Sequence, residues 1–165
     1  MQGKTLHIVR HGKALQEFIQ IQDDDRPLTA NGVLNNMIVA KKFVERYPVP
    51  DLIISSYAAR ALQTAHIFAR VMHFPHEKVK ASEELYLHGD KEIYRILDNL
   101  PDEIESVMIV GHNPDLTYVA NRFSPRIGEI STSSVVTVIF ETKRWSDFHE
   151  VKTKCSFLDK KDFIN

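Results

Sequence analysis

The sequence predicts a three-layer α/β sandwich with a mostly parallel central sheet, helices on both faces and an antiparallel edge. Three short apolar runs, at residues 6–9, 52–54 and 107–110, are typical of buried parallel strands. Stretches with helical apolar spacing separate these runs, which is the alternation that parallel sheets need. A chain of 165 residues can bury one core, so we expect a single domain over residues 1–165.

Apolar spacing and helix-start residues predict the first two helices. Thr29 is expected to cap the first helix, with Leu28 packing on Val33. The predicted core face of this helix is Val33, Met37, Ala40, Val44 and Tyr47. Ser56 is expected to cap the second helix, which carries Arg60 in its first turn. The apolar face of the second helix is Leu62, Ala65, Ala69 and Met72.

Two more helices are predicted in the second half of the chain. One begins near Asp90, where apolar residues again recur at helical spacing. The other begins after the third apolar run, with Asn113 as its cap and Pro114 at its first position.

The C-terminal region predicts the antiparallel edge. Residues 135–140 and 148–154 flank a turn-like segment, which indicates a hairpin. Cys155 is expected to be an inert strand residue, and residues 158–165 are expected to form a loose tail.

Composition indicates an ordinary globular protein. Hydrophobic residues make up 43% and charged residues 26%, and the net charge is -1. This balance argues against nucleic acid or an anionic membrane as the main partner. One cysteine allows no intrachain disulfide, which suits a reducing compartment. The sequence shows no signal peptide and no apolar stretch of 18 residues, so we expect a cytoplasmic protein.

The tripeptide Arg10-His11-Gly12 stands at the exit of the first predicted strand. Ligands of α/β sheets gather at the carboxyl ends of strands, and glycine lets the backbone turn sharply and approach a ligand. The tripeptide therefore sets a fixed cation and a nucleophile side by side where a phosphate group would fit.

Two other strand exits supply matching residues. Arg60 follows the second apolar run near a helix start, where free backbone N–H groups favour an anion. His112 follows the third run, directly before the expected helix start at Asn113. We expect these strand ends to bring two arginines and two histidines to one phosphate-sized site.

These motifs resemble those of the histidine phosphatase superfamily, also called the phosphoglycerate mutase-like family. The family pattern is an Arg-His-Gly, a Ser-x-x-x-Arg-Ala-x-Gln-Thr-Ala helix start and a later Gly-His. Its counterparts here lie at residues 10–12, 56–65 and 111–113. The chain length and the Arg-Pro-Leu-Thr-Ala-Asn-Gly element at residues 26–32 are similar to those of the short SixA-type phosphohistidine phosphatases.

The residue types in this set suit phosphoryl transfer. A neutral His11 imidazole would attack phosphorus and form a phosphohistidine intermediate. Arg10 and Arg60 would hold the phosphoryl oxygens, with His112 as a further donor. The two guanidinium groups should lower the pKa of His11 below its usual value of about 6.5. The 8 histidines lack the spacing of a metal site, so we expect no metal and no cofactor.

A general acid is not evident. The mutase and acid-phosphatase branches place a carboxylate shortly after the leucine that Leu85 resembles, and this chain has Tyr86 and Leu87 there. Glu84 is the best remaining carboxylate for an acid or substrate-binding role, with a surface role as the alternative. A phosphohistidine releases an imidazole, which depends on a proton donor less than an alkoxide does.

Two features near the site are expected to have no catalytic role. Residues 13–26 are polar and predict a surface loop or short helix, in which the aspartates at 23–25 are expected to be solvated. His7 is expected to be a packed or hydrogen-bonded residue of the first strand.

The predicted function is hydrolysis of phosphohistidine on a protein, such as a phosphorelay or phosphotransferase component. Short connections around the site predict an open pocket that a projecting side chain can enter. The alternatives are a phosphatase for small phosphate esters and a weakly active phosphate-binding module. The sequence leaves the oligomeric state open.

Overall fold

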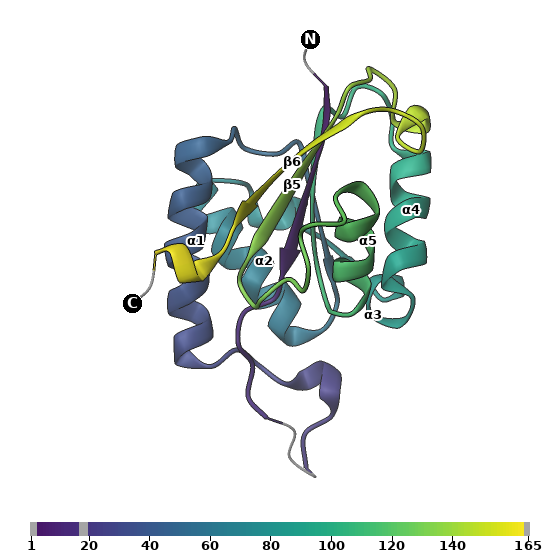
Figure 1. Cartoon of the computed structure of the whole chain (residues 1–165). Helices are drawn as coiled ribbons and strands as arrows, with labels where there is room; N and C mark the ends of the chain where they lie inside the picture. Colours follow the sequence, from purple (N-terminus) through teal and green to yellow (C-terminus); the bar gives the residue numbers. More distant parts are fainter. Residues whose placement is uncertain (1–2, 17–19, 164–165) are drawn as a thin grey trace.

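The computed structural model describes residues 3–16 and 20–163 and has the three layers that the sequence predicts (Figure 1). A six-stranded sheet in the order β3-β2-β4-β1-β5-β6 lies between two layers of helices. The strands are β1 (Lys4–Arg10), β2 (Leu52–Ser56), β3 (Lys80–Ser82), β4 (Ser106–Gly111), β5 (Val135–Phe140) and β6 (Thr153–Leu158).

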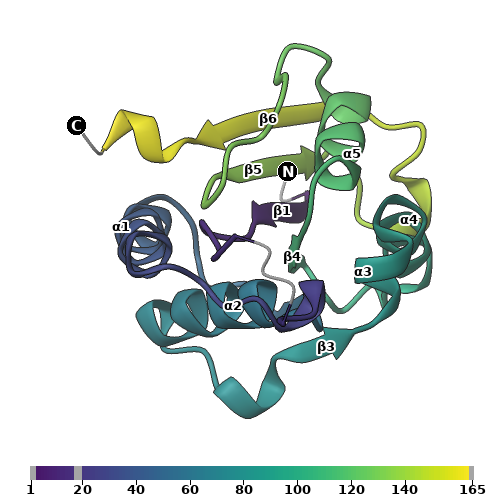
Figure 2. The same ribbon diagram turned by 90° about the horizontal axis from the view of Figure 1, so that it is seen from below.

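The strand directions bring the three sequence motifs to one end of the sheet. β1, β2, β3 and β4 run parallel, and β5 and β6 add an antiparallel edge, which confirms the predicted fold class. In the strand register Arg10 pairs with Gly111, and Ser55 pairs with Val110. The carboxyl ends of β1, β2 and β4 therefore meet, and Figure 2 looks onto this end of the sheet.

Helices cover both faces of the sheet. α1 (Ala30–Arg46) and α2 (Ala59–Met72) lie on one face, and α4 (Gly89–Asn99) and α5 (Asp115–Phe123) lie on the other (Figure 2). The short α3 (Glu84–Leu87) precedes α4. In β1, Val9 belongs to the core under α1 and α2, whereas Ile8 belongs to the core under α4 and α5. Burial on both faces explains why the parallel strands are continuous apolar runs.

Helix starts agree with the sequence in part. Thr29 caps α1 as predicted, because its hydroxyl accepts a hydrogen bond from the backbone of the first turn. α2 begins with Ala58 at the cap position instead of Ser56, although Ser56 Oγ accepts a bond from the Ala58 N–H at 3.3 Å. α5 has Pro114 at the cap position, one residue later than predicted, and the Asn113 side chain does not cap it.

The buried face of α1 differs from the prediction. Val33, Met37 and Val44 are 37%, 38% and 40% exposed. The residues that α1 buries are Gly32, Asn36, Val39, Ala40 and Phe43. The helix carries two apolar stripes, and Asn36 marks the inner one because its Nδ2 donates to Thr64 Oγ1 of α2 at 2.9 Å. Apolar spacing alone therefore selected the wrong stripe.

The last strand lies later in the chain than predicted. β6 begins at Thr153, and the segment before it contains a short 3-10 helix, η3 (Trp145–Asp147). Trp145 and Phe148 are buried in the core under α4 and α5. The Trp145 indole also donates to the Ile104 carbonyl at 2.6 Å. The segment before β6 therefore packs into the core as a short helix and turn, and the predicted strand at 148–154 is wrong, because the strand runs from Thr153 to Leu158.

The predicted loose tail is also wrong as far as residue 163. Leu158 is buried at the end of β6, and Phe163 packs against the core cluster that contains Phe43. Between them Asp159 caps a further 3-10 helix, η4 (Lys160–Asp162). Residues 164–165 of the predicted tail lie outside the described residues.

His7 and Cys155 are structural residues of the sheet, as predicted. His7 is buried in β1, with its Nδ1 2.9 Å from Thr137 Oγ1. Cys155 is a half-buried residue of β6, and burial raises the pKa of its thiol.

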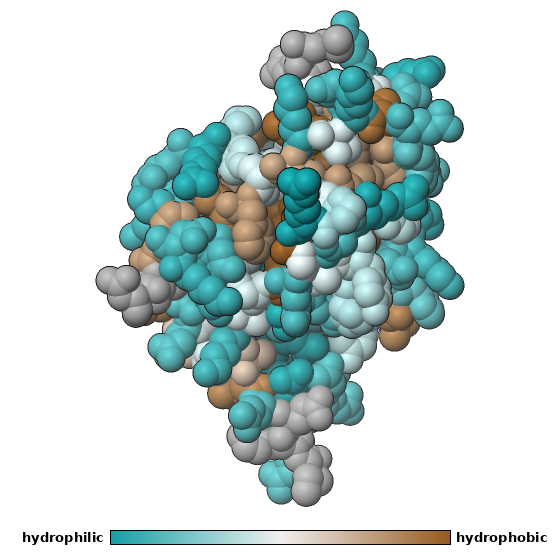
Figure 3. Space-filling model, in the orientation of Figure 1, coloured by the Kyte–Doolittle hydropathy of each residue, from teal (hydrophilic) through white to brown (hydrophobic). Residues whose placement is uncertain are grey.

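On the face drawn in Figure 3, apolar side chains form separate patches among polar ones. No helix of the described residues is long and apolar enough to cross a membrane.

Candidate active site

His11 lies where β1 ends, with its imidazole oriented by the adjacent main chain. Its Nδ1 is 2.7 Å from the Gly12 carbonyl oxygen. A carbonyl only accepts hydrogen bonds, so the proton of the neutral ring belongs on Nδ1 and the lone pair belongs on Nε2. Burial lowers the pKa of His11 to about 4, and the positive charges of Arg60 and Arg10 act in the same direction. A neutral imidazole with a free Nε2 is a nucleophile at neutral pH.

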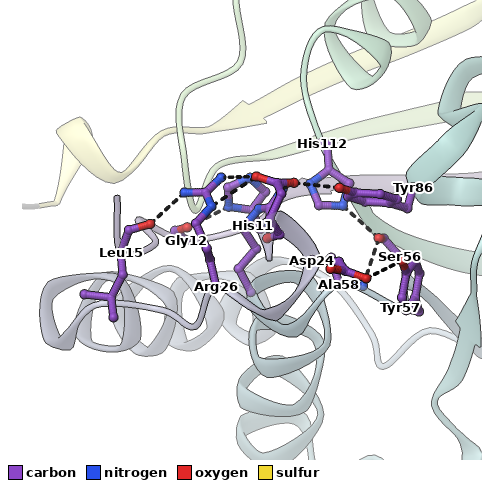
Figure 4. Close-up of polar contacts among 12 residues, drawn as sticks. His11, Gly12, Leu15, Asp24, Arg26, Ser56, Tyr57, Ala58, Tyr86 and His112 are labelled. Carbon is purple, nitrogen blue, oxygen red and sulfur yellow. Dashed lines mark hydrogen bonds and ion pairs between the residues drawn. The ribbon is translucent and has the colours of Figure 1, made fainter. Parts of the chain in front are cut away.

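His112 stands beside His11 at the end of β4. The two ring centroids are 5.1 Å apart, and the planes are tilted by 53°. His112 Nε2 lies 2.7 Å from Ser56 Oγ, at the end of β2 (Figure 4). Burial, together with the neighbouring His11 and Arg60, lowers the pKa of His112 to about 3. The ends of β1, β2 and β4 thus bring both imidazoles into a buried environment, which favours their neutral forms.

Two guanidinium groups, one half-buried and one buried, lie near the histidines and come from different elements. Arg10 ends β1, and its Nη1 donates to the Ile130 carbonyl at 2.7 Å. Arg60, in the first turn of α2, is only 6% exposed. The Nε atoms of both arginines are buried and have no hydrogen-bond partner among the described residues. The predicted set of His11, His112, Arg10 and Arg60 therefore comes together, as the strand-end argument expected.

The loop after β1 contributes a carboxylate that the sequence placed in solvent. A 3-10 helix, η1 (Asp23–Asp25), lies against the start of α2. Asp23 Oδ2 accepts hydrogen bonds from Arg60 at 3.0 Å and from the Tyr86 hydroxyl at 2.7 Å. Its Oδ1 accepts from Arg26 at 2.7 Å. Burial raises the pKa of Asp23, but the hydrogen bonds from Tyr86, Arg26 and Arg60 together hold it well below its usual range.

Asp24 is also bonded, because its Oδ2 accepts from the Tyr57 hydroxyl at 2.5 Å. The expectation of solvated aspartates is therefore wrong for Asp23 and Asp24. The reason is long-range: their partners come from α2, α3 and the turn before α2, which a local charge pattern does not reveal.

Gly12 lies in close contact with α1 and is hydrogen-bonded to α2. Thr64 Oγ1 accepts from the Gly12 N–H at 3.0 Å and from Asn36 at 2.9 Å, and it donates to the Arg60 carbonyl at 2.8 Å. A Cβ at Gly12 would lie 2.7 Å from Asn36 Nδ2, which is closer than real contacts allow. Thr64 thereby links the main chain next to His11 to α2, the helix that carries Arg60.

Comparison with known proteins agrees with this geometry. The profile of the histidine phosphatase superfamily (branch 1) matches residues 6–113. The chain belongs to this superfamily. An uncharacterized protein of a Picosynechococcus strain is 31% identical over 115 residues, which cover 67% of each chain.

Two solved structures show the same fold over nearly the whole chain. A SixA-type protein from Agrobacterium tumefaciens is 25% identical, with a TM-score of 0.78 and coverage of 95% of this chain and 98% of that chain. The protein histidine phosphatase SixA, solved with tungstate, is 21% identical, with a TM-score of 0.80 and coverage of 96% and 98%. The family and the fold support phosphatase activity.

Tyr86 of α3 brings a phenol to the site. The Tyr86 ring stands edge-on to the His112 ring, with centroids 5.5 Å apart (Figure 4). The hydrogen bond to Asp23 raises the pKa of Tyr86, which makes it a weak proton donor. Glu84, two residues earlier in α3, is exposed. The structure thus turns Tyr86 toward the histidines and leaves Glu84 at the surface.

Arg26, Asp23 and Tyr86 are the site residues that sequence reasoning missed. Arg26 lies in the element at residues 26–32 that resembles SixA-type proteins. The resemblance could have indicated Arg26, but it assigned no role to this residue. Arg26 also donates to the Leu15 carbonyl at 2.6 Å, which closes the loop on itself (Figure 4). Within residues 3–16 and 20–163, no three histidine, cysteine or acidic side chains come together as metal ligands.

Proposed function

We propose that this chain hydrolyses phosphohistidine on a protein through a covalent intermediate on His11, in the cytoplasm and without a metal ion. The observation that carries the proposal is the 2.7 Å contact between His11 Nδ1 and the Gly12 carbonyl. It leaves Nε2 unprotonated, and burial keeps the ring neutral. Membership of a phosphatase family and the two arginines near His11 also support the proposal.

The chemical steps follow from the residues around His11. Nε2 attacks phosphorus as the bond from phosphorus to the leaving nitrogen breaks, and the phosphoryl group moves to Nε2. Water then attacks the phosphoryl group as the bond from phosphorus to Nε2 breaks, the electron pair of that bond returns to Nε2, and orthophosphate leaves with the protons of the water. Arg10, Arg60 and His112 would stabilise the equatorial oxygens, which carry the charge of the transition state.

The leaving group supports phosphohistidine as the substrate. Tyr86 takes the place of a carboxylic acid, and its raised pKa makes protonation of an alkoxide slow. An imidazole leaves as a neutral molecule when its other nitrogen carries a proton, so it needs little help. The similarity to SixA proteins supports a protein as the carrier of the phosphohistidine.

The test compares leaving groups under identical conditions. A phosphohistidine protein and p-nitrophenyl phosphate should be hydrolysed, whereas serine phosphate and phosphoglycerate should react slowly. A preference for an alkyl ester, together with a large loss of rate in Glu84→Gln, would contradict the proposal and make Glu84 the acid.

A further inference from the structure

A second cavity adjoins the candidate phosphoryl site on the side of β5. It has a volume of about 410 Å³ and is lined by Arg10, Glu129, Ser131, Thr132 and Lys161. Arg10 belongs to both places, because it ends β1 next to His11 and also faces this cavity. Whatever binds in the cavity therefore lies directly beside the phosphoryl group.

Positive side chains gather around this cavity. Lys160 Nζ donates to Thr132 Oγ1 at 2.6 Å. Burial lowers the pKa of Lys160, and the charges of Arg10, Lys161 and Lys13 lower it further against the opposing charge of Asp159. Three cations, from β1, the loop after it and η4, thus act on the Lys160 ammonium. The whole chain carries a net charge of -1, so this concentration is local.

The two carboxylates nearby, Glu129 and Asp159, offset the positive charge of the cluster only in part. Glu129 is 80% exposed and lies 3.9 Å from Arg10, a distance at which a surface ion pair contributes little. Asp159 accepts hydrogen bonds from Ser131 Oγ at 3.1 Å and from the Lys161 N–H at 2.9 Å. Like charges held together at a cavity are stabilised when an anion binds there.

The segment that lines the cavity, residues 131–132, is followed by a residue that is hydrogen-bonded to the main chain of His11. Ser133 adopts a left-handed conformation with φ of 65°. Its N–H lies within hydrogen-bond distance of the carbonyls of Arg10 and His11, at 3.1 and 3.2 Å. The segment that contains Ser131 and Thr132 therefore keeps a constant position relative to His11. A ligand with two anionic groups at a matching separation would find both sites prepared.

We propose that this cavity, which we call the second anion subsite and define by Arg10, Ser131, Thr132 and Lys161, binds a side-chain carboxylate of the phosphoprotein close to its phosphohistidine. The inference rests on the proposed function, because it names a recognition feature of that substrate. It predicts that the partner carries aspartate or glutamate next to the modified histidine. The cluster then selects substrates by charge before the phosphoryl group is transferred.

The first experiment uses two phosphohistidine peptides that differ only in having glutamate or glutamine beside the histidine. We expect the wild-type protein to hydrolyse the glutamate peptide with a kcat/KM about 10-fold higher, a preference that falls as salt rises. Lys161→Glu should remove or reverse the preference. Lys143→Glu changes the charge equally beyond the opposite end of β5 and should keep it.

A second experiment requires no turnover. Tripolyphosphate presents further anionic groups beside its terminal phosphate, whereas orthophosphate presents one phosphate alone. Wild type and Lys143→Glu should bind tripolyphosphate more tightly than orthophosphate, measured by calorimetry, and Lys161→Glu should lose that difference.

The two experiments separate the two proposals. If neither peptide is hydrolysed, the proposed function fails, and the tripolyphosphate comparison alone decides the second anion subsite. If both peptides are hydrolysed equally by wild type, or if Lys161→Glu keeps the preference, the second anion subsite is overturned and the proposed function stands.

Discussion

The two ends of β1 each carry a cation, and the two cations are bonded differently. Lys4, at the beginning of the strand, is 1% exposed, and its ammonium donates to the carbonyls of Asp102 and Ile104 and to Glu105 Oε1. These contacts use all three of its donors. At the other end Arg10 keeps a buried Nε that has no partner in the described part of the chain.

The same contrast holds for the whole molecule. Five buried side-chain atoms have no hydrogen-bond partner among the described residues: Arg10 Nε, Asn36 Oδ1, Arg60 Nε, His112 Nδ1 and Ser133 Oγ. All belong to residues that contact or form the strand ends around His11. Folded proteins normally satisfy buried polar groups, so unused capacity gathered in one place indicates a region arranged for binding. Lys4 shows what a cation in a purely structural role looks like.

The largest expected effect separates two histidines of β1. His11→Ala should lower phosphatase activity by about 10³-fold or more, because the nucleophile is lost. His7→Gln should leave the rate nearly unchanged, since His7 contacts Thr137 in the core. During turnover the wild-type protein should carry an acid-labile, base-stable phosphoryl label that His11→Ala lacks. Activity retained in His11→Ala would end the covalent mechanism.

The second-largest expected effect separates Arg60, which lies near the candidate site, from Lys4 at the opposite end of β1. Arg60→Ala should reduce kcat/KM about 10²-fold, the usual loss when one preorganised donor is removed. Lys4→Met should leave kcat/KM within about twofold but reduce the free energy of unfolding by about 1–3 kcal/mol, because carbonyl acceptors lose their donor. Denaturation curves measured beside the kinetics test both. The reverse pattern would show that unused hydrogen-bond capacity does not mark the site.

Acid should affect the core histidine and the site histidines through the same mechanism. Burial lowers the pKa values of His7 and His112 to about 3 and that of His11 to about 4. The unfolded chain therefore binds protons below about pH 6.5 that the folded chain refuses. Stability should be complete above that pH and fall towards pH 4, by about 1.4 kcal/mol per pH unit for each such histidine.

Urea denaturation between pH 7 and 5 measures this loss, and His7→Gln should make the slope shallower by the share of one histidine. NMR titration of the ring protons should find His11 neutral at pH 5.5. A His11 pKa near 6.5 would contradict the effect of burial and of the two arginines.

The smallest effect separates two residues of α3. Glu84→Gln should change kcat/KM for phosphohistidine by less than about twofold, because Glu84 is exposed. Tyr86→Phe should lower it severalfold, because Asp23 loses a hydrogen bond and Arg60 loses part of its orientation. Equal losses in both variants would give Glu84 a direct role.

The sequence by itself determined the fold class and predicted that the four candidate site residues lie at one end of the sheet. Buried parallel strands are local apolar runs, and their carboxyl ends coincide for any parallel sheet, so Arg10, His11 and His112 could be placed without a structure. Arg60 followed for the same reason, since its helix begins directly after β2. Each of these inferences depends on neighbours in the chain.

Only the tertiary structure decided the features that depend on distant partners. Asp23 lies 37 residues from Arg60, and their ion pair exists because η1 packs against the start of α2. α1 has two apolar stripes, and the one that is buried contains Asn36, which is hydrogen-bonded to Thr64 of α2. The last strand begins at Thr153 and not at Phe148, because Trp145 and Phe148 pack into the core against distant residues. Local patterns leave such choices nearly equal in free energy, and contacts between segments far apart in the chain decide them.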